Sequence, residues 1–131
     1  MEIKAKIDTG ANSSSIDKNL VKKLGYEDVI NEFDLMMDNV ADKNLSEKEL
    51  NDHFKDSFKK WGDDFSGVLI KSSHGESYRL VIKMDVILSG IKVHTAFTVI
   101  DRSSLQFPAI IGRKGLKNFL VDPSKTVKEV I

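Results

Sequence analysis

Ile3-Lys4-Ala5-Lys6-Ile7-Asp8-Thr9-Gly10-Ala11 is the stretch of sequence that decides the fold. Apolar and basic residues alternate from Ile3 to Ile7, and this period of two is typical of a β-strand with one buried face. Asp8 follows the strand, and Gly10 allows a tight turn in which any Cβ would crowd the backbone. The stretch therefore predicts that the carboxylate of Asp8 is held on a glycine turn at the end of a strand.

A second informative stretch, Phe107-Pro108-Ala109-Ile110-Ile111-Gly112-Arg113, lies near the other end of the chain. It contains two β-branched residues, a glycine and an arginine, and Leu116 follows it. An Asp-Thr-Gly triplet alone is a weak signal, because three common residues recur by chance. The two stretches in this order, with a glycine-tipped hairpin between them, are far more specific.

Together these stretches resemble the retropepsin family of single-domain aspartic proteases, which carry Asp-Thr-Gly-Ala early and an apolar-apolar-Gly-Arg segment late. The closer resemblance is to the retropepsin-like domain that is named an ATP-dependent zinc protease. The matching residues are Lys4 to Ala11, Asp101-Arg102-Ser103, Gly112-Arg113 and Leu120-Val121-Asp122-Pro123-Ser124. The resemblance implies a mainly β fold, a closed retropepsin-like barrel, formed by a single domain over residues 1–131.

Composition excludes several other classes of protein. A chain of 131 residues fits one domain, and its 20 basic residues balance its 20 acidic residues, so we expect no nucleic-acid partner. The absence of cysteine excludes a disulfide framework and a thiolate nucleophile. No apolar run approaches the ~20 residues of a membrane span, so we expect no membrane association. The charged start Met1-Glu2-Ile3-Lys4 lacks the apolar core of a signal peptide, and we therefore expect a cytoplasmic protein.

Two helical regions are predicted before the second half of the chain. Caps at residues 12–15, apolar residues at helical spacing and a stop at Gly25 predict a short helix after the Asp8 turn. Residues 27–66 then read as a helical insertion, in which Ser46 and Glu49 form a capping-box pattern. One face of that helix is apolar, and we expect it to contact the core or a dimer partner rather than a separate partner groove. The residues of this face are Leu50, Phe54, Phe58 and Trp61.

The second half predicts a β-meander. Apolar residues alternate along 80–88, and Ser89-Gly90 is a hairpin turn into a strand over 92–100. An earlier turn, Ser72-Ser73-His74-Gly75-Glu76, predicts a glycine-tipped hairpin. Aspartic proteases close such a hairpin over the substrate, so the resemblance implies that Ser73, His74 and Gly75 bind substrate.

The chemistry implied by the resemblance needs two carboxylates that share one proton. Two such groups at contact distance have pKa values that are pushed apart, so one activates a water and the other donates a proton. The chain has one Asp-Thr-Gly triplet, so a catalytic site requires a homodimer with Asp8 from each copy. In the family the threonine bonds across the dimer axis, which implies that role for Thr9. Gly10 completes the catalytic triplet. Ala11 matches the family's small residue beside the two aspartates, and we expect it to contact substrate.

The late stretch supports this site in the family. Ile110 and Ile111 correspond to an apolar segment behind the catalytic loop that contributes to substrate binding, and Gly112 and Arg113 to structural support. The family arginine pairs with an aspartate just after Asp-Thr-Gly-Ala, but this chain has Asn12 there. Three partners for Arg113 remain open, namely Asp17, Asp122 and a backbone carbonyl.

We expect neither a metal nor another cofactor. The three histidines show no ligand spacing such as His-Glu-x-x-His, and no glycine-rich phosphate loop occurs. The expected activity is that of a homodimeric aspartic endopeptidase acting on a peptide or protein. The alternatives are a catalytically silent module for protein binding or dimerisation, and an enzyme that is latent as a monomer.

Overall fold

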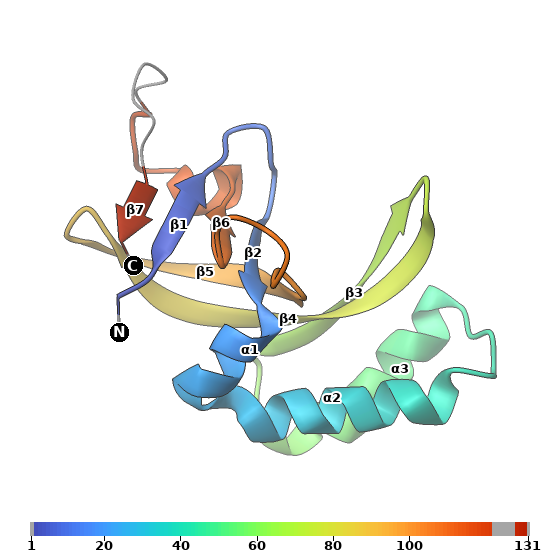
Figure 1. Cartoon of the computed structure of the whole chain (residues 1–131). Coiled ribbons are helices and arrows are strands. Elements are labelled where there is room, and N and C mark those ends of the chain that lie inside the picture. The colour runs from blue at the N-terminus through green and yellow to red at the C-terminus, as the bar shows by residue number, and fades with distance from the viewer. Residues whose placement is uncertain (1, 122–127, 131) are drawn as a thin grey trace.

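The structure is a computed structural model, and it describes residues 2–121 and 128–130. Figure 1 shows the arrangement of the helices and strands, in which the α-helices form one group between the second and third strands. The elements are β1 (Lys4–Ile7), β2 (Ser14–Asp17), α1 (Lys18–Val21), the π-helical turn η1 (Lys22–Tyr26), α2 (Glu27–Val40), α3 (Glu47–Phe58), the 3-10 turn η2 (Lys59–Trp61), β3 (Phe65–Ser72), β4 (Gly75–Leu88), β5 (Ile91–Ile100), β6 (Ala109–Ile111), the 3-10 turn η3 (Arg113–Leu116) and β7 (Lys128–Val130).

All strands belong to one mixed sheet in the order β3-β4-β5-β2-β6-β1-β7. The pairs β1/β6 and β2/β5 are parallel, and the other neighbours are antiparallel. The predicted mainly β framework is confirmed, but the prediction of a closed barrel is wrong. Over the described residues the sheet stays open, since β3 and β7 are its two ends. Among the described strands β3 pairs with β4 alone, and it also contacts α3.

The short helix after the Asp8 turn is confirmed, but it begins later than predicted. The cap is Asp17, whose Oδ2 accepts from the backbone N–H groups of Asn19 and Leu20 at 3.2 and 3.4 Å. Residues 14–17 are instead strand β2, which pairs with β5 and β6. Sheet pairing therefore outweighs the helical spacing of Ile16. The predicted stop is confirmed by the positive φ of 103° at Gly25, after which α2 begins.

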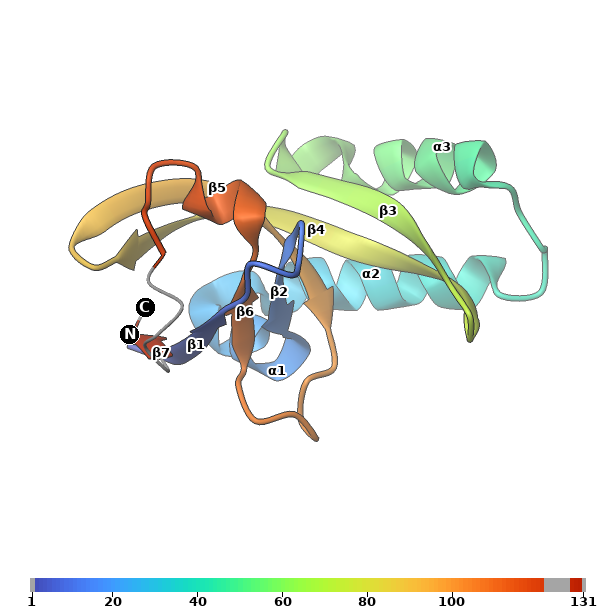
Figure 2. The same cartoon turned by 90° about the horizontal axis from the view of Figure 1, so that it is seen from above.

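The predicted helical insertion forms two helices, α2 and α3, which lie beside the β3–β4 part of the sheet (Figures 1 and 2). The capping box at the start of α3 is confirmed, with Ser46 and Glu49 bonded reciprocally at 3.2 Å. The apolar face of α3 packs into the core rather than outward. Phe54 and Phe58 are buried and stack at a centroid distance of 4.2 Å, and Trp61 is partly buried.

The β-meander is confirmed, and its first hairpin projects from the molecule. β3 pairs with β4 up to Ser72 and Gly75, which leaves the predicted turn residues at the tip. Gly75 has a φ of +111°, a backbone conformation that residues other than glycine rarely adopt. In Figure 1 this hairpin rises away from the helices. Over the described residues, no helix is long and apolar enough to cross a membrane.

Candidate functional site

The site is built where the loop after β1 crosses the end of β6. β6 lies between β1 and β2, so the chain must pass over β6 to connect its two neighbours. Backbone hydrogen bonds between the two segments hold this crossing together. The N–H of Asp8 donates to the carbonyl of Ile111 at 2.9 Å, and the N–H of Arg113 donates to that of Ala11 at 2.8 Å. Because both segments supply donors and acceptors, the position of the loop depends on β6 and the residues that follow it.

Asp8 stands on the tight turn that the sequence predicts. Its Oδ1 accepts from the backbone N–H of Gly10 at 3.0 Å, and its carbonyl accepts from Ala11 at 3.2 Å. A Cβ on Gly10 would lie 3.2 Å from that same Oδ1, so a side chain there would press on the carboxylate. Asp8 is partly buried, whereas Thr9 and Gly10 are exposed. The loop therefore lies at the surface of the single chain.

Gly112 is the closest contact beneath this loop. A Cβ there would lie 2.5 Å from the carbonyl oxygen of Ser13 and 2.9 Å from that of Ala11. Its N–H donates to Ser14 Oγ at 3.1 Å, and Ser14 is 1% exposed. From the sequence, Ser14 was expected only as a helix cap. A serine shortly after Asp8-Thr9-Gly10 was the available signal for this supporting bond.

The structure selects one of the three partners left open for Arg113. Its Nη1 donates to the carbonyl of Thr9 at 2.9 Å, so a carbonyl takes the place of the family's aspartate. Asp17 is engaged elsewhere, because its Oδ1 accepts from the backbone N–H of Arg102 at 2.8 Å. Asp122 lies outside the described residues. Arg113 is exposed, so this bond does not depend on a buried counter-charge.

Arg102 is a buried arginine whose role was not predicted from the sequence. It is 7% exposed, and its guanidinium donates to the carbonyl of Phe107 at 2.9 Å and to Ser15 Oγ at 3.1 Å. Burial lowers the pKa of Arg102, and the charge of Asp17 acts in the opposite direction. Arg102 thereby joins β2 to the loop that leads into β6. The motif Asp101-Arg102-Ser103 was visible in the sequence, but the contacts of Arg102 with Ser15 and Asp17 join residues far apart in the chain.

The residues predicted to bind substrate fall into three groups. Ser73 and His74 are exposed at the hairpin tip, where the backbone N–H of His74 donates to Ser72 Oγ at 3.3 Å. Ile110 is partly buried, on the opposite side of β6 from Ile111. Ile111 is 0% exposed, so it belongs to the core beneath the loop and does not line an open surface.

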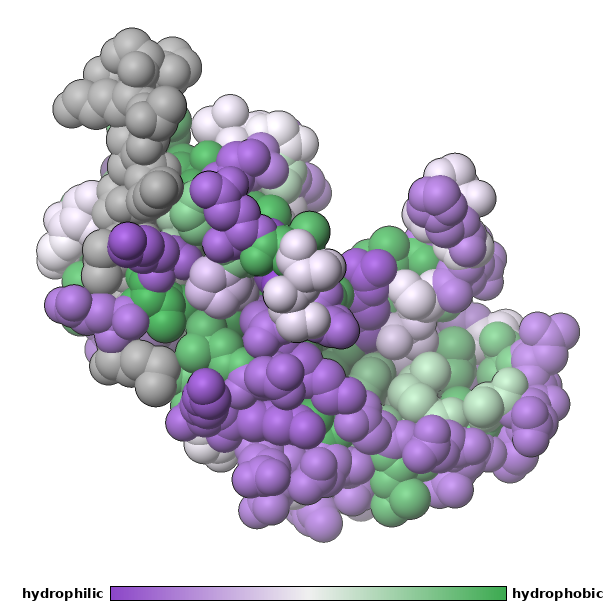
Figure 3. All heavy atoms as spheres, in the orientation of Figure 1, coloured by the Kyte–Doolittle hydropathy of each residue, from purple (hydrophilic) through white to green (hydrophobic). Residues whose placement is uncertain are grey.

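The surface between the Asp8 loop and the hairpin is hollowed. Figure 3 shows a deep recess between the body of the molecule and the projecting β3–β4 hairpin. The helices α2 and α3 lie below this recess in the same orientation (Figure 1). The Asp8 loop and the β3–β4 hairpin, which are far apart in the sequence, thus border one concave surface.

Comparison with protein families now assigns the chain. The RimB-like family model, described as the retropepsin-like aspartic endopeptidase RimB, matches residues 1–130. The chain belongs to the RimB-like family. Neither a curated protein nor a solved structure matches it significantly. Because the match spans both the Asp8 loop and β6, it agrees with the resemblance seen in the two sequence motifs.

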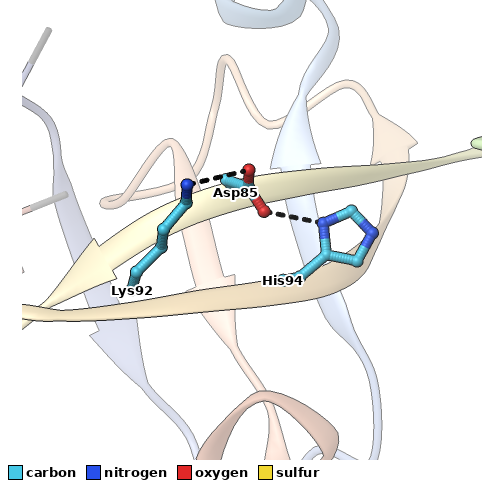
Figure 4. Close-up of polar contacts among 3 residues, drawn as sticks. All are labelled: Asp85, Lys92 and His94. Carbon is cyan, nitrogen blue, oxygen red and sulfur yellow. Dashed lines mark hydrogen bonds and ion pairs between the residues drawn. The ribbon is translucent and has the colours of Figure 1, made fainter.

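One polar cluster of this RimB-like chain lies outside the Asp8 loop (Figure 4). Asp85 on β4 contacts His94 Nδ1 at 2.7 Å and Lys92 Nζ at 3.6 Å, and all three side chains are at least half exposed. The hydrogen bond with His94 is the main cause of a lowered pKa of Asp85. Over residues 2–121 and 128–130, no group of three or more histidine and acidic side chains could hold a metal ion.

Proposed function

We propose that this chain is an aspartic endopeptidase that works as a homodimer with one Asp8 from each copy. The observation that carries the proposal is the Asp8-Thr9-Gly10 turn. It is hydrogen-bonded to the end of β6 and lies at the surface of the single chain. An exposed turn can meet its symmetry mate on a twofold axis, whereas a covered one cannot. Membership of a family described as aspartic endopeptidases supports the same activity.

In the proposed reaction, the two Asp8 carboxyl groups share one proton. The ionised carboxylate takes a proton from a bound water as the water oxygen attacks the peptide carbonyl carbon. The protonated carboxyl donates its proton to the carbonyl oxygen, which gives a neutral tetrahedral intermediate. Protonation of the amine nitrogen and return of the hydroxyl proton to a carboxylate then break the C–N bond.

The surroundings of Asp8 fit these steps. Gly10 leaves room next to Oδ1, and the bond from the Gly10 N–H orients the carboxylate. Thr9 is exposed, as a residue that bonds across a dimer axis must be. The projecting hairpin, with Ser73, His74 and Gly75 at its tip, would cover an extended peptide in the recess and exclude water from it. The cytoplasmic location expected from the sequence stays a prediction.

Exchange of Asp8 for asparagine tests this proposal. Asp8→Asn keeps an oxygen that accepts from the Gly10 N–H, so fold and association should be retained while the shared proton is lost. We expect cleavage in a peptide library to fall by at least about a hundredfold. A silent binding or dimerisation module would be indifferent to this change and to pepstatin-type inhibitors.

A matched control is available in the same chain. Asp101 forms the same local turn, because its Oδ1 accepts from the N–H of Ser103 at 2.9 Å. Asp101→Asn should therefore leave cleavage unchanged. Cleavage that survives in Asp8→Asn would remove Asp8 from the mechanism and favour a contaminating protease or another site.

A further inference from the structure

The β3–β4 hairpin leaves the helical layer at Tyr78. Residues 71–77, on the side of the tip, are all exposed, whereas Tyr78 is 7% exposed. Its neighbour across the ladder, Leu69, is partly buried against the core. Tyr78 is therefore the last point at which the projecting hairpin is packed on the rest of the chain. A displacement of the backbone at Tyr78 would therefore also move the exposed part of the hairpin and its tip.

Tyr78 joins the hairpin to both helices. Its ring stacks on Phe33 of α2 at a centroid distance of 6.2 Å. Its hydroxyl donates to Asn51 Oδ1 of α3 at 2.6 Å. Burial, and to a lesser degree the charge of Glu47, raises the pKa of Tyr78 to about 12. The phenol is therefore protonated and able to donate throughout the neutral range.

The ring reaches α3 by crossing the neighbouring strand at a glycine. A Cβ on Gly67 would lie 2.1 Å from the Tyr78 hydroxyl oxygen and 2.3 Å from the adjoining ring carbon. Only a residue without a side chain at 67 lets the ring lie across β3. Since β3 is the end strand of the sheet, the ring then contacts the helix directly beyond it.

A pocket that opens to solvent lies beside this hydrogen bond. This pocket of about 520 Å³ lies between α3 and the start of β3, and its walls include Asn51, Phe58 and Gly67. Close-packed side chains resist the movement of one element against another because they leave few voids. A pocket beside a contact lowers that resistance. The hydrogen bond from Tyr78 to Asn51 thus fixes β4 relative to α3 at a place where the packing leaves space for the two elements to move.

We propose that Tyr78 and Asn51 are positioning residues that set the angle of the β3–β4 hairpin over the recess, so that α3 controls how the hairpin closes. The consequence for catalysis rests on the proposed function, in which the hairpin covers the substrate. The geometric consequence does not rest on it. Loss of the link should widen the range of hairpin angles and weaken substrate binding more than the chemical step.

Spin-label distances test the geometric part without any need for activity. The chain has no cysteine, so cysteines placed at Ser73 on the hairpin tip and at the exposed Asp52 on α3 can be labelled selectively. Tyr78→Phe removes only the hydroxyl and should broaden the distance distribution. Tyr26→Phe is the matched control, since it removes the hydroxyl of the other tyrosine, whose ring contacts Phe65. That control should keep the distribution of the parent chain.

Kinetics test the catalytic part. Tyr78→Phe should raise KM about fivefold, which is the equivalent of one lost hydrogen bond, and change kcat less than twofold. Asn51→Leu should reproduce both effects from the side of α3. Asn51→Asp keeps an acceptor oxygen at the same atom and should restore a narrow distribution and the original KM.

The outcomes separate the two proposals. An unchanged distance distribution in Tyr78→Phe and Asn51→Leu overturns the anchoring role. Equal broadening in Tyr26→Phe also overturns it, because the effect would then be general loosening. If Tyr78→Phe fails to fold, Asn51→Leu decides alone, since Asn51 is only partly buried. If the cleavage experiment with Asp8→Asn contradicts the proposed protease activity, the spin-label distances still decide whether Tyr78 and Asn51 hold the hairpin in place.

Discussion

Gly112 shows at the residue scale how tightly the candidate catalytic loop is constrained. Its missing side chain is what allows the carbonyls of Ser13 and Ala11 to pass so close above β6. Both obstacles are backbone atoms, which cannot rotate away as the end of a side chain can. The loop that carries Asp8 therefore depends on a glycine that lies in a different part of the sequence.

We predict that Gly112→Ala destabilises the fold by about 1–3 kcal/mol and reduces cleavage further than stability alone explains. The added methyl group must push the loop, and Asp8 with it, away from β6. Gly115→Ala is the control, because the nearest atom to its Cβ would be a methyl of Ile111 at 3.1 Å, which is a side-chain atom. Urea unfolding and peptide cleavage measure the two effects, and equal stability of the two variants would contradict the explanation.

The residue types of the site were predictable, but several contacts were not. Asp8, Gly10 and Gly112 were identified because a carboxylate on a glycine turn and a glycine after two β-branched residues are local patterns. The bond of Arg113 to the carbonyl of Thr9 and the bond of Arg102 to Ser15 each join residues about a hundred positions apart. Local pattern carries no information about such pairs when several polar groups are available.

At the scale of elements, the start of α3 is a local structure that the sequence alone specifies. Ser46 and Glu49 satisfy each other's backbone N–H groups, and no other element takes part in these bonds. The hydrogen bond from the Ser46 backbone, followed by that from its side chain, lowers the pKa of Glu49 from its ordinary value of 4.5. A lowered pKa means that the ionised form of Glu49 stabilises the folded state.

We predict that Ser46→Ala lowers the free energy of unfolding by about 1 kcal/mol, because a helix N–H loses its acceptor. Glu49→Ala should also destabilise the chain at neutral pH. The contribution of Glu49 is fully present above its ordinary pKa and is lost as the pH falls through the lower pKa of the folded state. The difference in free energy of unfolding between Glu49→Ala and the parent chain should therefore be smaller at about pH 3 than at neutral pH. Chemical unfolding at both pH values measures it. A difference in this free energy that does not depend on pH would contradict the assignment.

Elements that form by local preference were predicted, and one that depends on tertiary pairing was not. The two hairpins and the capped helix agree with their turn and capping residues. β2 was predicted as a helix start, because Ser14 and Ser15 are good caps and Ile16 has helical spacing to Leu20. Its strand conformation is imposed by β5 and β6 on either side, and neither neighbour is close in sequence.

At the scale of the whole molecule, the open sheet differs from the closed barrel expected from the family resemblance. The arrangement of the helices explains why the sequence could not reveal this. Closure depends on whether the two end strands meet, and here the β3 end is packed on α3. The insertion was recognised as helical from its pattern, but its position relative to the sheet is a tertiary property.

The single Asp-Thr-Gly triplet leads to a prediction for mixtures of two chains. If each site needs Asp8 from both copies, a dimer with one Asp8→Asn subunit lacks the shared proton and is inactive. When parent and Asp8→Asn chains are mixed equally and allowed to exchange, about a quarter of the dimers contain two parent chains. Cleavage should then fall to about a quarter of that of the parent chain at the same total concentration.

A site complete within one chain gives a different result in the same mixture, because half of the chains would still be active. Cleavage would then fall only to about half, and it would change linearly with the fraction of parent chain. Mixing with Asp101→Asn chains controls for dilution and should cost no activity. Light scattering of the same samples, at neutral and mildly acidic pH, gives the mass of the particles. A strict monomer that cleaves peptide linearly with its concentration would exclude the shared site, since one Asp8 alone supplies no second carboxyl group to hold the proton.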